Sequence, residues 1–217
     1  MKIYISQNSA FFVLRYFLEF FEQKNSITIF VTENDRGRVK KIYELAKSFG
    51  VFNFIFACVC ELFYRLFFIN RLKLIKHIKT SDDQVNHVLQ TLLLLQKGPV
   101  EIFSIGCPCK IDVTLLSCSN VQGLNLHGGI LPYQVGRFSP VKSLKSGHQV
   151  LGCSLHKISD NFDKGEIVSQ SGFVVKEKNI LLNYLEVLKL SKILLHQYHN
   201  GTLCYLSNDI KNLLENK

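Results

Sequence analysis

Three residues beside glycine turns carry the chemistry that this sequence suggests. Asn125 and His127 stand in the segment Asn-Leu-His-Gly-Gly-Ile-Leu-Pro, and Asp163 follows 36 residues after the histidine in Asp-Lys-Gly. An amide can donate to an oxyanion, an imidazole can take or give a proton, and a carboxylate can orient that imidazole. This combination indicates an acyl-transfer site rather than a piece of core.

A short strand at 121–126 must position the first two of these groups. Alternate residues of a strand point to the same face, so Asn125 and His127 would emerge together at its carboxyl end. The two glycines after the histidine let backbone and substrate approach closely, and Pro132 fixes a turn beyond them. In open α/β sheets the ligand crevice lies outside the carboxyl ends of the strands, where this pair would lie.

Hydrophobic periodicity predicts strands and helices in alternation around the motif. We predict strands at 2–6, 27–31, 100–105, 121–126, 150–157 and 166–175. We predict helices at 9–23, 36–48, 82–96, 110–117, 140–146 and 179–199, followed by a short polar tail. The pattern is typical of an α/β fold with a Rossmann-like, doubly wound, mostly parallel sheet and helices on both faces. We expect one catalytic domain over residues 1–217.

Residues 51–79 leave two questions open. The start of this stretch is either a buried strand or the beginning of a long helix, and periodicity does not decide between them. Residues 51–69 contain only two charges, Glu61 and Arg65. A membrane span needs ~20 apolar residues, and two charges near the middle argue against a stable span. Because basic residues follow, an amphipathic helix at an anionic lipid surface is one interpretation. A core or dimer-interface helix is the one we favour.

Charge and cysteine content narrow the class of protein. The net charge of +9 favours an anionic partner, namely nucleic acid, a membrane surface or a phosphorylated small molecule, unless it only marks a lysine-rich surface. Seven cysteines, without a cleavable-looking signal, indicate reduced thiols and a cytoplasmic location. The pairs Cys58-x-Cys60 and Cys107-x-Cys109 lack the two-residue spacer common in structural zinc sites, so we expect no metal.

The chain between about residues 100 and 170 resembles the formyltransferases that use 10-formyltetrahydrofolate. The resemblance rests on Asn-x-His-x-x-x-Leu-Pro at 125–132, Gly136, Gly-Cys-Ser-Leu-His at 152–156 and Asp-x-Gly-x-Ile at 163–167. It implies the formyltransferase fold, with 10-formyltetrahydrofolate as co-substrate.

The resemblance also implies roles for particular residues. Asn125 would donate to the oxyanion, His127 would accept the proton of the attacking amine or, if protonated, stabilise the oxyanion, and Asp163 would orient the imidazole and relay protons. The folate would bind the group formed by Cys107, Cys109, Lys110, Ile111 and Asp160. The acceptor substrate would bind the group formed by Arg36, Gly129, Tyr133 and Arg137. Many relatives carry Tyr-Arg-Gly after the proline, whereas here the arginine follows the glycine.

Within this family the chain most resembles the sugar-nucleotide N-formyltransferases, such as the enzymes that act on dTDP-4-amino-4,6-dideoxyglucose. Residues 6–12 contain no glycine for the phosphate loop of glycinamide ribonucleotide formyltransferases. The chain also shows no counterpart of the tRNA-gripping domain of methionyl-tRNA formyltransferases, so we expect no nucleic-acid partner. The expected acceptor is a dTDP- or UDP-linked amino sugar for bacterial surface polysaccharide, and the expected assembly is a homodimer. The alternatives are glycinamide ribonucleotide as acceptor, a formyl hydrolase, and a non-catalytic nucleotide- or RNA-binding relative.

Overall fold

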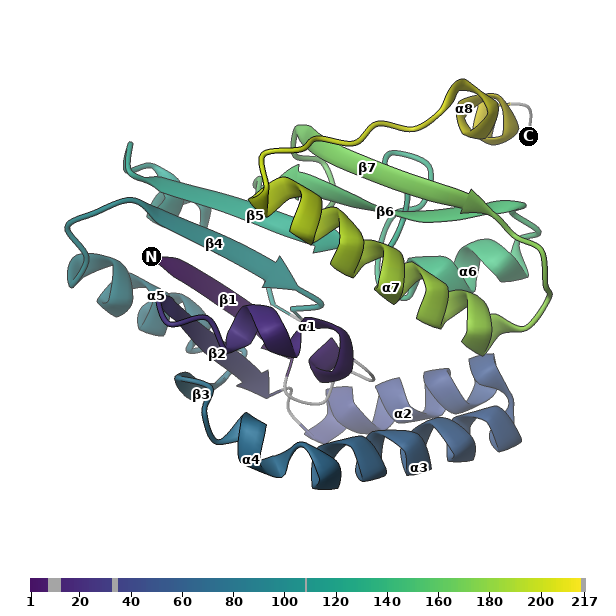
Figure 1. Cartoon of the computed structure of the whole chain (residues 1–217), viewed down its shortest axis with the longest axis horizontal. Coiled ribbons are helices and arrows are strands. Elements are labelled where there is room, and N and C mark those ends of the chain that lie inside the picture. The colour runs from purple at the N-terminus through teal and green to yellow at the C-terminus, as the bar shows by residue number, and fades with distance from the viewer. Residues whose placement is uncertain (8–12, 33–34, 108, 216–217) are drawn as a thin grey trace. The chain divides into compact units, whose positions relative to one another are not determined.

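The computed structural model describes residues 1–7, 13–32, 35–107 and 109–215 (Figure 1). Its strands form a seven-stranded sheet in the order β3-β2-β1-β4-β5-β6-β7. The β1–β2, β1–β4 and β2–β3 pairs are parallel, and β6–β7 is antiparallel. The expected α/β class with a mostly parallel sheet is therefore confirmed. The chain divides into two compact units, Met1–Leu124 and Asn125–Lys217.

The first unit alternates strands and helices. Its elements are β1 (Lys2–Gln7), α1 (Val13–Phe21), β2 (Ser26–Thr32), α2 (Asp35–Phe49), α3 (Val51–Phe67), α4 (Ile69–Leu72), β3 (His77–Ser81), α5 (Val85–Leu94), β4 (Val100–Ile105), the 3-10 turn η1 (Val113–Leu116) and most of β5 (Val121–His127). Strand β1 pairs in parallel with β2 on one side and with β4 on the other. Other elements cover a central parallel strand on both faces. For this reason all residues of β1 after the first are buried.

Aromatic packing forms the centre of this unit. The ring of Tyr4 on β1 stacks on Phe103 of β4 with centroids 5.4 Å apart. Phe21 of α1 meets the same tyrosine edge-on at 5.5 Å and also contacts Phe30 of β2. The rings of Tyr4, Phe21 and Phe103 are at most 1% exposed, so this cluster joins two strands to the helix that covers them.

The second unit contains the motif loop and a β-hairpin. Its elements after β5 are α6 (Ser139–Lys145), β6 (Val150–Lys157), β7 (Ile167–Val174), α7 (Ile180–His199) and α8 (Asn208–Glu215). Helix α7 runs along β6 and β7 (Figure 1). Leu206 and Leu214, from the C-terminal segment, pack with Ile130 and Val150 in one buried cluster.

Three predictions about individual elements need correction. The start of residues 51–79, left open between a strand and a helix, is helix α3, followed by α4, and the short strand β3 after them is one that the sequence did not predict. The expected polar tail contains helix α8, whose apolar residues contact the rest of the second unit. The predicted helix at 110–117 is only the four-residue turn η1. Edge strand β3 is mostly polar and carries no strong hydrophobic period, and α8 is only eight residues long.

In the part of the chain that the structure describes, no single helix is long and apolar enough to cross a bilayer. The segment Ile42–Phe49 and α3 reach that length and hydropathy only as a pair bent by 120°.

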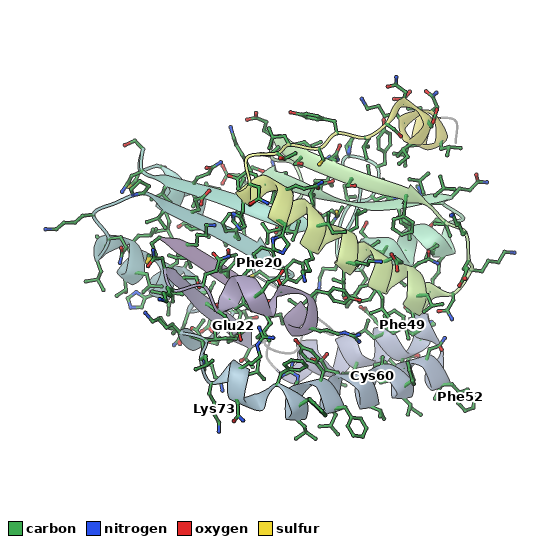
Figure 2. All side chains as sticks on the ribbon, in the orientation of Figure 1. Phe20, Glu22, Phe49, Phe52, Cys60 and Lys73 are labelled. Atoms are coloured by element: carbon green, nitrogen blue, oxygen red, sulfur yellow. The ribbon has the colours of Figure 1, made fainter. Side chains whose placement is uncertain are left out.

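We expect Phe103→Ala to lower the free energy of unfolding by about 3–5 kcal/mol, because it removes a fully buried ring from the Tyr4 cluster. Phe52→Ala is the matched control, since Phe52 is 90% exposed and projects from the start of α3 (Figure 2). That change should stay within about 0.5 kcal/mol of the wild type. Urea unfolding followed by circular dichroism measures both, and equal losses would contradict the assigned core.

Candidate active site

His127, the last residue of β5, lies between two hydrogen-bond acceptors. Its Nε2 is 2.7 Å from the backbone oxygen of Gln134, and its Nδ1 is 3.4 Å from Oδ1 of Asp163. The side chain is 9% exposed. A carbonyl oxygen and a carboxylate both accept, so each contact is favourable only when the facing nitrogen carries a proton. Both ring nitrogens of His127 therefore face acceptors, and the site suits the imidazole as a hydrogen-bond donor.

The close approach of Gln134 to His127 depends on a missing side chain at Gly129. A Cβ at position 129 would collide with the Gln134 carbonyl, the Ser139 hydroxyl and Nε2 of His127. The second glycine of the motif thus leaves space for the bond that holds the imidazole.

Asp163 is held from two sides by backbone geometry. Its Oδ2 accepts a 2.7 Å hydrogen bond from the amide N–H of Gly136, and its side chain is 10% exposed. The backbone of Asp163 is left-handed, with φ of 56°, a conformation that aspartate tolerates better than most residues. Two residues later, a Cβ at Gly165 would overlap the carbonyl of Lys157. The Asp-x-Gly spacing is explained by this tight turn against β6.

His156 is a site residue that the sequence analysis quoted only as part of a motif. Its Nδ1 is 2.9 Å from the carbonyl oxygen of Lys157, and its Nε2 is 2.9 Å from Nδ2 of Asn125. Since the carbonyl accepts, Nδ1 carries the proton, and Nε2 is left to accept from the amide. Burial lowers the pKa of His156 and so favours this neutral ring, against the opposing effect of Asp163.

The position of His156 follows from a β-bulge. The register of β6 against β7 shifts between Leu155 and His156. Bulges turn a side chain away from its regular direction and often occur beside active sites. Oδ1 of Asp163 lies 3.8 Å from Nε2 of His156, so the carboxylate stands near both imidazoles. Asn125, His127, His156 and Asp163 thus form one cluster, within which Asn125 bonds His156.

A buried polar network holds the motif loop against the hairpin. The hydroxyl of Ser154 donates to the carbonyl of Gly129 at 2.7 Å and accepts from the N–H of Leu131 at 3.0 Å. The side-chain amide of Gln170 donates to both Ser154 Oγ and the Leu131 carbonyl, at 2.8 Å each. The Leu131–Pro132 bond within this loop is cis. These bonds satisfy the buried backbone polar groups of a loop that has no strand partner of its own.

The other expected residues of the second unit lie outside this cluster. The hydroxyl of Tyr133 is 3.3 Å from Oε1 of Glu215 on α8, and the ring is 42% exposed. Arg137 and Asp160 are exposed, and the Arg137 guanidinium lies 5.8 Å from the ring of Phe138. Gly129 is buried beside His127.

The expected folate loop lies in the first unit, after β4. The side chain of Asn86 brackets this loop, because it donates to the Lys110 carbonyl at 3.1 Å and accepts from the Asp112 N–H at 2.9 Å. Ile111 is 4% exposed, and the Lys110 side chain is exposed. Arg36 lies on α2, and its side chain is outside the described part of the structure.

Cys107 and Cys109 face each other in the same loop, with their sulfur atoms 3.2 Å apart. The hydrogen bond from the Cys107 thiol stabilises the Cys109 thiolate and so lowers the pKa of Cys109. The same bond, together with burial, raises the pKa of Cys107. Among the described residues, no group of three or more His, Cys, Asp or Glu side chains has an arrangement that would hold a metal.

We expect the stability of the protein to fall in mild acid partly because of His156. Its folded pKa is lower than the unfolded value of ~6.5, so the unfolded chain takes up the proton first. The stability that His156 contributes in its neutral form is fully present above about pH 6.5. It is lost as the pH falls toward the lower pKa of His156 in the folded protein. Urea midpoints between neutral and acidic pH should fall less in His156→Gln than in the wild type. His87→Gln, an exposed control on α5, should keep the wild-type slope.

We expect Cys109 to be alkylated by iodoacetamide severalfold faster than Cys107 at neutral pH, because thiolates are the reactive form. Cys107→Ala removes the hydrogen-bond donor and should slow the labelling of Cys109. Tandem mass spectrometry of the peptide that contains both residues measures the rates. Equal labelling of the two thiols in the wild type would show that the bond between them has no such effect.

Residues 104–186 match the sequence profile of the family described as Formyl transferase, and this segment contains Asn125, His127, His156 and Asp163. The chain also resembles solved structures over most of its length. Against phosphoribosylglycinamide formyltransferase from Anaplasma phagocytophilum the TM-score is 0.58 at 16% identity, covering 95% of this chain and 97% of that one. Against a 4-N formyltransferase from Francisella tularensis it is 0.56 at 16% identity, covering 97% and 78%.

A sugar N-formyltransferase from a Shewanella species gives a TM-score of 0.53 at 13% identity, covering 98% of this chain and 79% of that one. Structural likeness at this identity establishes the shared fold. The profile match adds that the segment with the side-chain cluster is similar to the Formyl transferase family.

Proposed function

We propose that this protein is an N-formyltransferase that moves the formyl group of 10-formyltetrahydrofolate to the amine of a nucleotide-linked amino sugar. The observation that carries the proposal is the cluster of Asn125, His127, His156 and Asp163 at the end of β5. It combines two oxyanion donors with a carboxylate, which acyl transfer to an amine requires.

Two groups would stabilise the tetrahedral oxyanion that forms when the amine attacks the formyl carbon. Asn125 donates one N–H to His156 and has a second N–H on the same amide. A protonated His127 would add the attraction of its positive charge, since its two ring nitrogens face Gln134 and Asp163. A well-placed donor such as the Asn125 amide contributes about 3 kcal/mol to a transition state.

The proton of the attacking amine needs a different acceptor. In the role in which a protonated His127 stabilises the oxyanion, it cannot also take this proton, and Nε2 of His156 already accepts from Asn125. The carboxylate of Asp163, close to both rings, is the remaining base of the cluster. Asp163 would accept the proton, directly or through a water, and pass it to the leaving nitrogen of the folate.

The folate would bind along the loop of Cys107, Cys109, Lys110 and Ile111, with Asp160 as a further contact. Asn86 holds the backbone of this loop from behind, so its amides and carbonyls are fixed for a planar heterocycle. The bound folate supplies the formyl carbon and the leaving nitrogen.

For the acceptor we propose a dTDP- or UDP-linked amino sugar destined for a bacterial surface polysaccharide such as O-antigen. The absence of glycine in residues 6–12 supports it, since no backbone phosphate cradle is encoded after β1. We assign Arg36, Tyr133 and Arg137 to the acceptor side, together with the Gly129 turn. We further propose that residues 1–217 form a single catalytic domain and that the protein is a homodimer.

Glycinamide ribonucleotide is the second candidate acceptor. The fold similarity to the Anaplasma phosphoribosylglycinamide formyltransferase, with a TM-score of 0.58, supports this candidate as much as the score of 0.53 against the Shewanella sugar N-formyltransferase supports the first.

We expect the wild type to formylate one acceptor from a panel of dTDP- and UDP-linked 3-amino and 4-amino sugars and glycinamide ribonucleotide. Mass spectrometry would detect the added formyl group on the product. Asn125→Ala, His127→Asn and Asp163→Asn should each lower kcat about 10²–10³-fold, because each removes a donor or the base from the transition state. His87→Asn, which changes an exposed histidine, should retain full activity.

The pattern of products decides between the candidates. Formylated sugar supports the proposal, and formylated glycinamide ribonucleotide replaces it with the second candidate. Free formate without any acceptor would identify a hydrolase. No turnover of any kind, with folate still bound, would leave a non-catalytic relative of the family.

A further inference from the structure

Helix α3 turns its apolar side away from the protein. Nine large apolar side chains of this helix are between 44% and 90% exposed, and Phe52 and Phe67 are the most exposed of them. At 100° per residue these nine occupy one continuous arc of about 160°, which contains no charged residue. The interpretation of this stretch as core therefore fails for this face.

The polar residues of α3 lie on its other side. Glu61 is 9% exposed and bonds Arg65 one turn later at 2.8 Å. The hydroxyl of Tyr64 lies 3.4 Å from the carbonyl oxygen of Arg15, and Asn53 donates to the Phe49 carbonyl. A surface helix in water normally has the opposite arrangement, with its apolar stripe inward and its charges outward. The inverted pattern indicates that something apolar covers the outer face.

The size of this face is unusual for a free monomer. Phe52, Phe56, Phe63 and Phe67 are 90%, 63%, 64% and 86% exposed. At roughly 200 Å² for a whole phenylalanine, these four alone expose on the order of 600 Å². The largest apolar patch of a typical monomer is about 300–600 Å², so the whole face exceeds that range and marks an interaction surface.

The charge around the helix identifies the kind of partner. Residues 39–79 contain eight lysines and arginines and two glutamates, so this segment carries +6 of the net charge of +9. Lys47 precedes α3 and is exposed, and Lys73 and Lys76 are exposed beyond its end, with the 73%-exposed Leu74 between them. Two copies of this surface would repel each other, whereas anionic lipid would attract it.

We propose that α3 docks on the surface of an anionic lipid bilayer. The helix lies in the plane of the membrane, with its phenylalanines reaching ~5–10 Å to the boundary between headgroups and acyl chains. The flanking lysines contact the lipid phosphates. Because the polar side of α3 is bonded to the rest of the first unit, the helix lies on the bilayer and does not cross it.

A tryptophan reporter tests this contact directly, since the chain contains no tryptophan. Phe67→Trp, on the exposed face of α3, should shift its fluorescence to the blue with vesicles of phosphatidylcholine mixed with phosphatidylglycerol. It should respond weakly to phosphatidylcholine alone, and brominated lipid should quench it. Leu94→Trp is the matched control, because Leu94 is 80% exposed on another helix and should show no shift.

Vesicle co-sedimentation of the full chain separates the apolar and charged contributions. Phe52→Ser should weaken binding about tenfold or more, because it removes a phenylalanine that would be buried in lipid. Lys73→Gln and Lys76→Gln should each weaken it about fivefold, and added salt should reproduce that loss. Leu94→Ser should bind like the wild type. Circular dichroism and thermal unfolding confirm that each variant folds.

Three results would overturn the proposal. One is a wild type that does not sediment with the anionic vesicles. Another is binding that is unchanged by Phe52→Ser and by the lysine substitutions. The third is a dimer, seen by analytical ultracentrifugation, that Phe52→Ser disperses while the protein binds no vesicles, because a second copy would then cover the helix. Lipid binding and formyl transfer are measured separately, so either can fail alone.

Discussion

The buried side chain and carbonyl of Gln134 fix the loop on which the catalytic cluster depends. The residue is 2% exposed, and its amide bonds the N–H of Ile130 and the carbonyl of Val150 on β6. Its backbone carbonyl oxygen lies 2.7 Å from Nε2 of His127 and accepts a hydrogen bond from the Ser139 hydroxyl at 2.8 Å. One residue therefore joins the turn, the hairpin and the imidazole. Loss of such a bond would leave buried polar groups unsatisfied, which costs more than the bond itself contributes.

Two histidines within one cluster are given opposite roles by their neighbours. His127 faces only acceptors, the Gln134 carbonyl and the Asp163 carboxylate, so its surroundings make it a donor. His156 faces one acceptor and one donor, and burial lowers its pKa, so it stays neutral and holds Asn125. Asp163 is close to both rings. The chemical difference between the two histidines arises from the backbone carbonyls of Gln134 and Lys157 and from the Asn125 amide.

This explains which parts of the site the sequence could predict. The Asn-x-His spacing is visible because strands alternate with a period of two. Asp-x-Gly is visible because a close approach of two backbone segments, here Gly165 and the Lys157 carbonyl, requires a glycine. The parallel sheet was also predictable, because its strands are apolar runs that alternate with helices. The roles of Gln134 and His156 were not, since they depend on which carbonyl the folded loop presents. Strand β3 and helix α8 were missed because one is polar and the other is short.

Helix α3 shows a different limit of sequence reasoning. Periodicity reveals that a helix has two unlike faces, but it does not say which face the fold turns inward. The apolar stretch at 51–69 favours a core or dimer-interface helix, with an amphipathic helix at a lipid surface as the other interpretation. In the structure the buried positions include Ala57 and Glu61, and Phe52, Phe56, Phe63 and Phe67 are exposed. Exposed apolar side chains contribute no burial free energy to folding. The exposed side chains of α3 would therefore gain that free energy only when a partner covers them. The positive charge on both sides of the helix makes an anionic lipid surface the partner that fits.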